Sequence, residues 1–250
     1  IFVVGTAGSG KSTLAGAFSE WLRSQEQSTL LVNLDPAATS LPYEPDVDIR
    51  DMVDYERIMA TRRLGPNAAL IASVREVARH VEELAEEISS FNADFTIIDT
   101  PGQLELFAFR KEGRILSRSL GDKRKTIFFL LDPMFCATTK NFVASMFLSS
   151  SIYLTFGLPM IQVLNKIDAV PRKYLNRIER WSESVDALIV EVENRLRGGL
   201  MAFSREVAQA VHDIISSIPI IPVSSITMEG FPELHAMLTR VVGEGEIELR

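Results

Sequence analysis

A glycine-rich segment near the start of the chain has the residue types and the spacing of a phosphate-binding loop. It runs from Gly5 to Ser12 as GTAGSGKS and matches the pattern G-x-x-x-x-G-K-S/T in full. Glycine lacks a Cβ, so the backbone can curl with its N–H groups toward an anion. Lys11 would reach the β- and γ-phosphates of a nucleotide, and the Ser12 hydroxyl would supply one oxygen ligand to Mg²⁺. We expect the nucleotide to contact Gly8, Ser9, Gly10, Lys11, Ser12 and Thr13.

The alternative for this segment is a glycine-rich turn that binds no ligand. The flanking residues disfavour it, because the apolar run at residues 1–4 predicts a buried strand and the pattern from Thr13 to about Arg23 predicts a helix. Such a helix would direct the positive end of its dipole at the loop, where an anion would bind.

A second polar group follows the apolar run at residues 95–98 and reads D-T-P-G-Q. Asp99 would hold Mg²⁺ through a water molecule, and the Gly102 N–H would meet a γ-phosphate. By itself this stretch could be a strand followed by a proline turn. Together with the upstream loop it predicts a sensor of the γ-phosphate.

The tetrapeptide from Asn165 to Asp168 follows another apolar run and fits N-K-x-D, a pattern that can read guanine. The Asp168 carboxylate can accept hydrogen bonds from guanine N1–H and the 2-amino group, and adenine offers neither donor. Unpaired buried polar groups make that difference worth roughly 10⁴-fold in discrimination. Lys166 would lie along the base, and Asn165 would tie this segment to the phosphate-binding loop. Ser225 would contact guanine O6 through its N–H, although residues 224–226 also fit an ordinary turn.

Hydrolysis of a bound triphosphate needs a positioned water molecule and compensation of charge on the γ-phosphoryl group. Asp35 ends the apolar run at residues 29–34, at the strand end where open α/β sheets bind ligands. The polar candidates for placing the water are Asp35, Gln103 and Glu105. Glu105 could equally be a solvated residue in the first turn of a helix.

The elements that must position these residues alternate between strand and helix patterns. Further strands are expected at 126–131, 160–164 and 220–223, and an amphipathic helix from Val74 to Ile88. Because this helix lies between the strands at 29–34 and 95–98, those strands should be parallel. Residues 37–67 should be mostly loop with one short helix at 51–62.

A helical insertion is expected at about 171–219, with helices at 172–195 and 200–215 broken at Gly198-Gly199. The apolar residues Met134, Phe135, Phe142, Met146 and Phe147 are expected in the core.

The composition bounds the class of protein. A chain of 250 residues with 46% hydrophobic residues suits one α/β domain over residues 1–250. Its formal net charge of -7 gives no general reason to bind nucleic acid or an anionic membrane. The single Cys136 and the lack of an apolar run long enough to span a bilayer favour the cytoplasm.

With the tripeptide Gly65-Pro66-Asn67 added, these motifs resemble those of the GPN-loop GTPases, of the archaeal type by length. The resemblance implies a three-layer P-loop fold of the SIMIBI class with a mostly parallel sheet. It also implies a homodimer in which the Gly-Pro-Asn loop of one subunit reaches the γ-phosphate of the other, so that Asn67 acts in trans. Asp35, Gln103 and Glu105 would then lie near the attacking water. Ser224-Ser225-Ile226 departs from the common Ser-Ala-Lys.

Two functions are consistent with this pattern. The first is a GTPase that uses Mg²⁺, cycles between GTP and GDP, and acts as a homodimeric conformational switch. The second is a nucleotide-gated assembly factor in which hydrolysis is a slow timer, with a client related to RNA polymerase by family resemblance alone. An ATPase of the partitioning type is disfavoured by Asp168 and by the missing second lysine in the phosphate-binding loop. A nickel-insertion GTPase is disfavoured because the sequence has no His/Cys cluster.

Overall fold

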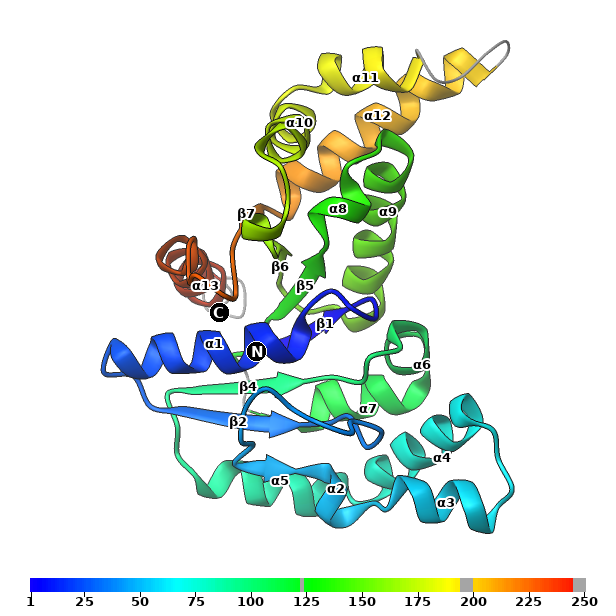
Figure 1. Ribbon diagram of the computed structural model, residues 1–250, viewed down its shortest axis with the longest axis vertical. Coiled ribbons are helices and arrows are strands. Elements are labelled where there is room, and N and C mark those ends of the chain that lie inside the picture. Colours follow the sequence, from blue (N-terminus) through cyan, green and yellow to red (C-terminus); the bar gives the residue numbers. More distant parts are fainter. Residues whose placement is uncertain (122–123, 194–199, 245–250) are drawn as a thin grey trace.

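The computed structural model describes residues 1–121, 124–193 and 200–244, and their strands form one seven-stranded sheet (Figure 1). The strand order is β3-β2-β4-β1-β5-β6-β7, and every neighbouring pair is parallel. The strands are β1 (Phe2–Gly5), β2 (Thr29–Asn33), β3 (Val47–Asp48), β4 (Phe95–Asp99), β5 (Ile127–Leu131), β6 (Met160–Leu164) and β7 (Ile220–Pro222).

The helices cover both faces of this sheet because its central strands are apolar on both sides. Alternate residues of β1 point to opposite faces, so that Val3 joins one apolar cluster while Phe2 and Val4 join the other. Helices α1 (Lys11–Ser24) and α13 (Phe231–Glu244) pack on the Val3 side. The opposite cluster includes residues of α4 (Pro66–Arg79), α5 (Val81–Ser90), α7 (Lys111–Ser119) and α9 (Thr139–Phe156). The predicted three-layer, SIMIBI-type arrangement is therefore confirmed.

The predicted parallel pairing of the second predicted strand with the strand that ends at Asp99 is also confirmed. Strand β2 pairs with β4 in the register Thr29 to Phe95 and Asn33 to Asp99. Strand β4 in turn lies between β2 and β1. The carboxyl ends of these three strands therefore meet at one edge of the sheet, which is where the predicted phosphate-binding residues follow.

The expectation of a single short helix at 51–62 within the loop-rich segment 37–67 was wrong. This segment contains β3, α2 (Ile49–Met52) and α3 (Tyr55–Thr61), and α4 already begins at Pro66. The side chain of Asp48 accepts a hydrogen bond from the Arg50 N–H, and that of Asp54 accepts one from the Arg57 N–H. Each aspartate thus caps a short helix, so polar residues that suggest a loop here mark helix starts.

The predicted amphipathic helix is divided in the structure, and the segment after Gln103 also forms two helices. The helix expected from Val74 to Ile88 begins earlier, at Pro66, and is interrupted at His80, which separates α4 from α5. The proline occupies the first helical position, where its fixed φ and missing N–H cost little. The pattern after Gln103 forms α6 (Leu104–Ala108) and α7, with Gly113 packed against α6.

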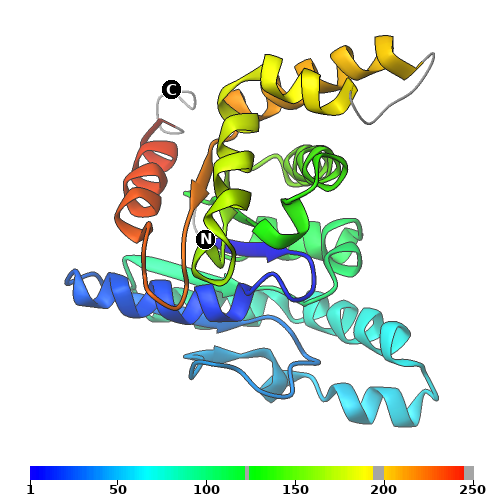
Figure 2. The ribbon, with the colours of Figure 1, turned by 45° about the horizontal axis from the view of Figure 1, so that its top comes forward.

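The predicted insertion is present between β6 and β7, and it extends to one end of the molecule, opposite α2–α5 (Figure 1). It consists of α10 (Arg172–Glu183), α11 (Val185–Glu193) and α12 (Leu200–Ser217), so the single helix expected at 172–195 is divided at Ser184. Figure 2 shows α11 and α12 side by side. Trp181 is buried, and its ring lies 5.4 Å from that of Phe142 on α9. The break expected at Gly198-Gly199 lies outside the described residues.

The expectation of five core residues in this region is right for two of them. Phe142 and Met146 are fully buried on α9, whereas Met134, Phe135 and Phe147 are about half exposed. The one-turn helix α8 (Pro133–Cys136) buries its first and last residues, which leaves the two between them on the outside. No helix in the described part of the chain is long and apolar enough to cross a membrane.

The contact between α6 and α7 gives a prediction about stability. A Cβ at Gly113 would lie 2.0 Å from the Phe107 carbonyl oxygen, so Gly113→Ala should force the two helices apart. We expect the free energy of unfolding to fall by roughly 2–3 kcal/mol, measured by urea denaturation. Gly243→Ala is the matched control, because a Cβ at Gly243 has nothing within 4 Å and should not lower stability. Equal unfolding midpoints for the two variants would contradict this account.

Candidate nucleotide-binding site

The predicted phosphate-binding loop joins β1 to α1 and is shaped by two glycines in the left-handed region. Gly8 has φ 76° and Gly10 has φ 91°, a conformation that favours glycine. Gly10 is the residue that caps α1, and no side chain makes a capping hydrogen bond there. Thr13 lies in the first turn of this helix, and the buried Ser9 hydroxyl has no hydrogen-bond partner among the residues that the structure describes. The loop thus leaves polar groups available to an anion.

The Lys11 side chain is folded against this loop. It is only 6% exposed, and its Nζ donates hydrogen bonds to the carbonyl oxygens of Gly5 and Thr6 at 3.2 and 3.3 Å. Burial lowers the pKa of Lys11, while the nearby carboxylates of Asp99 and Asp35 act in the opposite direction. Phosphate oxygens would be stronger acceptors for this ammonium than neutral carbonyls.

Asp99 ends β4 and is 1% exposed. Its Oδ2 accepts a hydrogen bond from the Tyr43 hydroxyl at 3.1 Å, whereas its Oδ1 is buried and makes no hydrogen bond of normal geometry to any described residue. Burial raises the pKa of Asp99 to about 6, although the hydroxyls of Ser12 and Tyr43 and the Lys11 ammonium lower it. A buried carboxylate oxygen beside the Ser12 hydroxyl is the kind of oxygen ligand set that Mg²⁺ prefers. These residues therefore fit the metal.

The Gly102 N–H, which should meet a γ-phosphate, is occupied in this structure by another anion. It donates a hydrogen bond of 3.1 Å to Oδ2 of Asp35, and Oδ1 of Asp35 accepts one of 3.0 Å from the Ala37 N–H. The Thr100 hydroxyl donates to the Val3 carbonyl oxygen at 2.8 Å and so ties the segment to β1. A γ-phosphate would have to replace Asp35 at the Gly102 amide.

The remaining predicted hydrolysis residues lie where α4 and α6 begin. Gln103 Nε2 donates a hydrogen bond of 3.1 Å to Oδ1 of Asn67 in the same chain. Glu105 is exposed in the first turn of α6, and it lines a cavity of about 570 Å³ together with Arg75 and Arg110. In the part of the chain that the structure describes, Glu105 bonds to neither Gln103 nor Asn67. The structure therefore joins Gln103 to Asn67 but not to Glu105.

The predicted base-reading segment follows β6 and contacts the phosphate-binding loop directly. Asn165 is buried, and its Nδ2 donates a hydrogen bond of 3.2 Å to the Ser9 carbonyl oxygen. Its Oδ1 accepts bonds from the N–H and the hydroxyl of Ser225 at 3.2 and 2.7 Å. A Cβ at Gly10 would lie 2.6 Å from Asn165 Nδ2, so the glycine makes this close approach possible. Asn165 thus holds three loops together.

Lys166 and Asp168 each form a hydrogen bond with a neighbouring polar side chain. Lys166 has φ 65°, and its Nζ bonds to the Gly8 carbonyl oxygen and to Oδ2 of Asp132, the latter at 3.0 Å. The Ser224 hydroxyl donates a hydrogen bond of 2.6 Å to Oδ1 of Asp168. Asp168 is exposed, so its second oxygen can meet a base.

Two residues of this site were missed by the sequence reasoning. Asp132 follows β5, so the rule that ligands bind at the carboxyl ends of parallel strands could have found it. Tyr43 lies in the connection between β2 and β3, far in sequence from any motif, and no local pattern marks its contact with Asp99.

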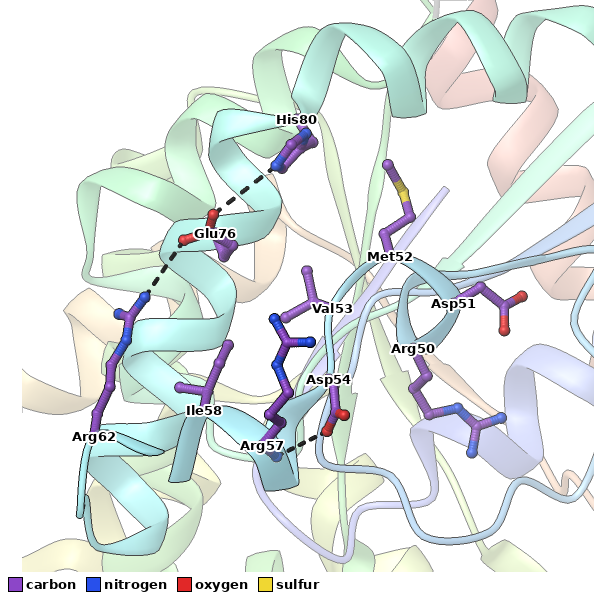
Figure 3. Close-up of a pocket in the computed structure, with 10 residues that line it drawn as sticks. All are labelled: Arg50, Asp51, Met52, Val53, Asp54, Arg57, Ile58, Arg62, Glu76 and His80. Carbon is purple, nitrogen blue, oxygen red and sulfur yellow. Dashed lines mark hydrogen bonds and ion pairs between the residues drawn. The ribbon is translucent and has the colours of Figure 1, made fainter. Parts of the chain in front are cut away.

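A second cavity, of about 370 Å³, lies between α2, α3 and α4 (Figure 3). None of the predicted nucleotide-contacting residues lines it. Glu76 lies 3.9 Å from both Arg62 and His80, so one carboxylate faces two basic groups. Three arginines and three carboxylates line the cavity, so it has no dominant charge.

Comparisons with known proteins agree on one family. A family model described as "Conserved hypothetical ATP binding protein" matches residues 3–244. The chain is 30% identical over 240 residues to a GPN-loop GTPase of Pyrococcus abyssi, covering 95% of this chain and 94% of the relative. A crystal structure of that GTPase in its apo form superposes with a TM-score of 0.85 at 29% identity, covering 96% of each chain.

GPN-loop GTPase 1 of Saccharomyces cerevisiae is 30% identical over 253 residues, which cover 98% of this chain. The chain spans 66% of that relative's length and 59% of its Dictyostelium discoideum counterpart. The family model, the archaeal relative and its structure all match along almost the whole chain. The chain belongs to the GPN-loop GTPase family.

Proposed function

We propose that this chain binds GTP with Mg²⁺ and hydrolyses it to GDP and phosphate. The observation that carries the proposal is the hydrogen bond from Asn165 Nδ2 to the Ser9 carbonyl oxygen. It holds the N-K-x-D segment against the phosphate-binding loop, so that one ligand with a base and a phosphate chain could contact both. The printed names of the relatives, as GTPases, support the same activity.

Guanine rather than adenine is the base that the Asp168 carboxylate favours. The Ser224 hydroxyl occupies Oδ1 and fixes the carboxylate, so the exposed side chain can accept from N1–H and the 2-amino group of guanine. The description of the family model names ATP, but adenine would leave this carboxylate without donors. We therefore infer a strong preference for GTP.

The triphosphate would be held by groups that now contact the protein itself. Lys11 would exchange the carbonyl oxygens of Gly5 and Thr6 for the β- and γ-phosphates, and the Gly102 N–H would exchange Asp35 for the γ-phosphate. Ser12 and Asp99 would hold Mg²⁺. When bound, the metal neutralises charge on the β- and γ-phosphate oxygens.

Hydrolysis transfers the γ-phosphoryl group from the bridging oxygen of GDP to a water oxygen. Asp35, once displaced from Gly102, keeps a carboxylate close to the γ-phosphate position, where it can accept a hydrogen bond from the water. The Gln103 amide can orient the same water, and Asn67 can donate to the γ-phosphoryl oxygens as a neutral group. A neutral donor compensates less charge than an arginine would, so turnover should be modest.

We further propose a homodimer formed through the Gly-Pro-Asn region, in which GTP and GDP favour different arrangements. Asn67 is exposed at the start of α4, where a second subunit can reach it. Its contact with Gln103 of its own chain links this region to the γ-phosphate sensor. Replacement of Asp35 by the γ-phosphate would move the sensor and, through Gln103, the Asn67 loop.

The base preference can be tested with Asp168→Asn. The amide cannot accept from both guanine donors, so the ratio of GTP to ATP affinity should fall by roughly 100-fold, measured by calorimetry. Asp186→Asn, at an exposed position on α11, is the matched control and should keep the wild-type ratio. An unchanged ratio in Asp168→Asn would remove the base-reading role.

The role of Gln103 can be tested with Gln103→Leu. Leucine keeps the size of the side chain but cannot orient water, so GTP affinity should persist while single-turnover hydrolysis slows by roughly 100-fold. Gln209→Leu on α12, whose amide donates a hydrogen bond of 2.9 Å to Asp213, is the control. A normal rate in Gln103→Leu would exclude Gln103 from the mechanism.

Mixing of variants tests whether Asn67 acts in trans. Asn67→Ala should slow hydrolysis more than it weakens binding, and Lys11→Ala should abolish binding. In a mixed dimer, the Asn67→Ala subunit supplies an intact nucleotide site and the Lys11→Ala subunit supplies an intact Asn67. Turnover should therefore partly return. If turnover of the mixture equals the average of the separate variants, Asn67 acts within its own chain, through the contact with Gln103.

A further inference from the structure

The connection between β2 and β3 places one side chain against the predicted metal ligand. Tyr43 lies in this connection, and its hydroxyl donates a hydrogen bond of 3.1 Å to Oδ2 of Asp99 across 56 positions in sequence. Nothing in the motifs of the chain assigns a role to this residue. Its hydroxyl is nevertheless the donor that holds one oxygen of the carboxylate at the end of β4.

The ring of Tyr43 is anchored to the helix that follows the phosphate-binding loop. A Cβ at Gly16 of α1 would lie 3.0 Å from Tyr43 Cβ and 3.3 Å from its Cδ1, so the glycine leaves room for the tyrosine. Glycine within a helix costs about 1 kcal/mol relative to alanine. Tyr43 also packs against the apolar cluster that contains Leu14 and Phe18 of α1. The ring therefore has a fixed position.

The two oxygens of Asp99 are consequently unlike. Oδ2 accepts the hydrogen bond from Tyr43, whereas Oδ1 is buried and makes no hydrogen bond of normal geometry within the described part of the chain. The Tyr43 hydroxyl is the donor in this contact, because an ionised carboxylate can only accept a hydrogen bond. A donor to one oxygen fixes the rotation of the carboxylate and leaves the other oxygen for a ligand.

We propose that Tyr43 is a positioning residue for Mg²⁺: its hydroxyl holds Oδ2 of Asp99, so that Oδ1 faces the metal beside Ser12. This inference rests on the proposed binding of GTP with Mg²⁺. Outer partners of this kind orient the ligands of a metal, and their loss typically weakens metal binding by 10–100-fold. The metal would thus be supported by the β2–β3 connection as well as by the two sequence motifs.

The test is a titration of Mg²⁺ into protein and a non-hydrolysable GTP analogue, with the midpoint of metal-dependent binding as the readout. Tyr43→Phe keeps the ring on Gly16 but removes the hydroxyl. We expect its midpoint to rise by roughly 10-fold, with analogue affinity in EDTA unchanged. Tyr153→Phe, at an exposed position on α9, is the matched control and should keep the wild-type midpoint.

A second variant moves the tyrosine without altering it. Gly16→Ala places a methyl group against Tyr43 Cβ and should raise the Mg²⁺ midpoint in the same direction. A purely structural role would lower the melting temperature and the affinities with and without metal together, and it would leave the midpoint unmoved. An unmoved midpoint in Tyr43→Phe overturns the proposal. A lower midpoint also overturns it, because the hydroxyl would then compete with the metal.

The wild-type titration separates this inference from the proposed function. If wild-type protein binds no GTP analogue, the proposed function fails and the role of Tyr43 fails with it. If it binds the analogue with no dependence on Mg²⁺, the metal site and Tyr43 fail while guanine binding stands. If it shows metal-dependent binding and Tyr43→Phe shows the same midpoint, only the inference about Tyr43 is wrong.

Discussion

The buried ammonium of Lys11 is the charge on which the whole site depends. A buried charge is costly unless it is paired. Here the carboxylates of Asp99 and Asp35 lie near the ammonium, and two carbonyl oxygens accept hydrogen bonds from it. Those carboxylates come from the ends of β4 and β2, which lie next to each other in the sheet. The all-parallel strand order is therefore what balances the charge of the phosphate-binding loop before any phosphate arrives.

The fold could be predicted where the signal is local and apolar. The strand runs, the crossover between β2 and β4 and the helical insertion follow from periodicity and the need to bury apolar surface. The second short helix before Pro66 was not predicted, because aspartates such as Asp48 and Asp54 are common both in loops and at helix starts. Here each of them caps a helix. Phe135 was misplaced because the direction of a side chain on a one-turn helix depends on tertiary packing.

The site was predictable to the same extent. Motifs indicate which residues follow which strand, and the parallel order of the sheet then brings those residues together. A contact between side chains from two different connecting segments leaves no such pattern in the sequence. The contact of Tyr43 with Asp99 spans 56 positions, and that of Gln103 with Asn67 spans 36. Asp35 was expected near the attacking water. The structure adds that its carboxylate accepts a hydrogen bond from the Gly102 N–H, a contact that depends on how closely two loops approach each other.

The close approach at Gly10 has a consequence for how this protein can change over time. Any larger side chain there would collide with the Asn165 amide, which also bonds to Ser9 and Ser225. A substitution made at this position would therefore disturb the proposed recognition of the base and the proposed binding of the phosphates together. Natural variation at position 10 cannot adjust one of these properties separately, so selection acting on either would preserve the glycine.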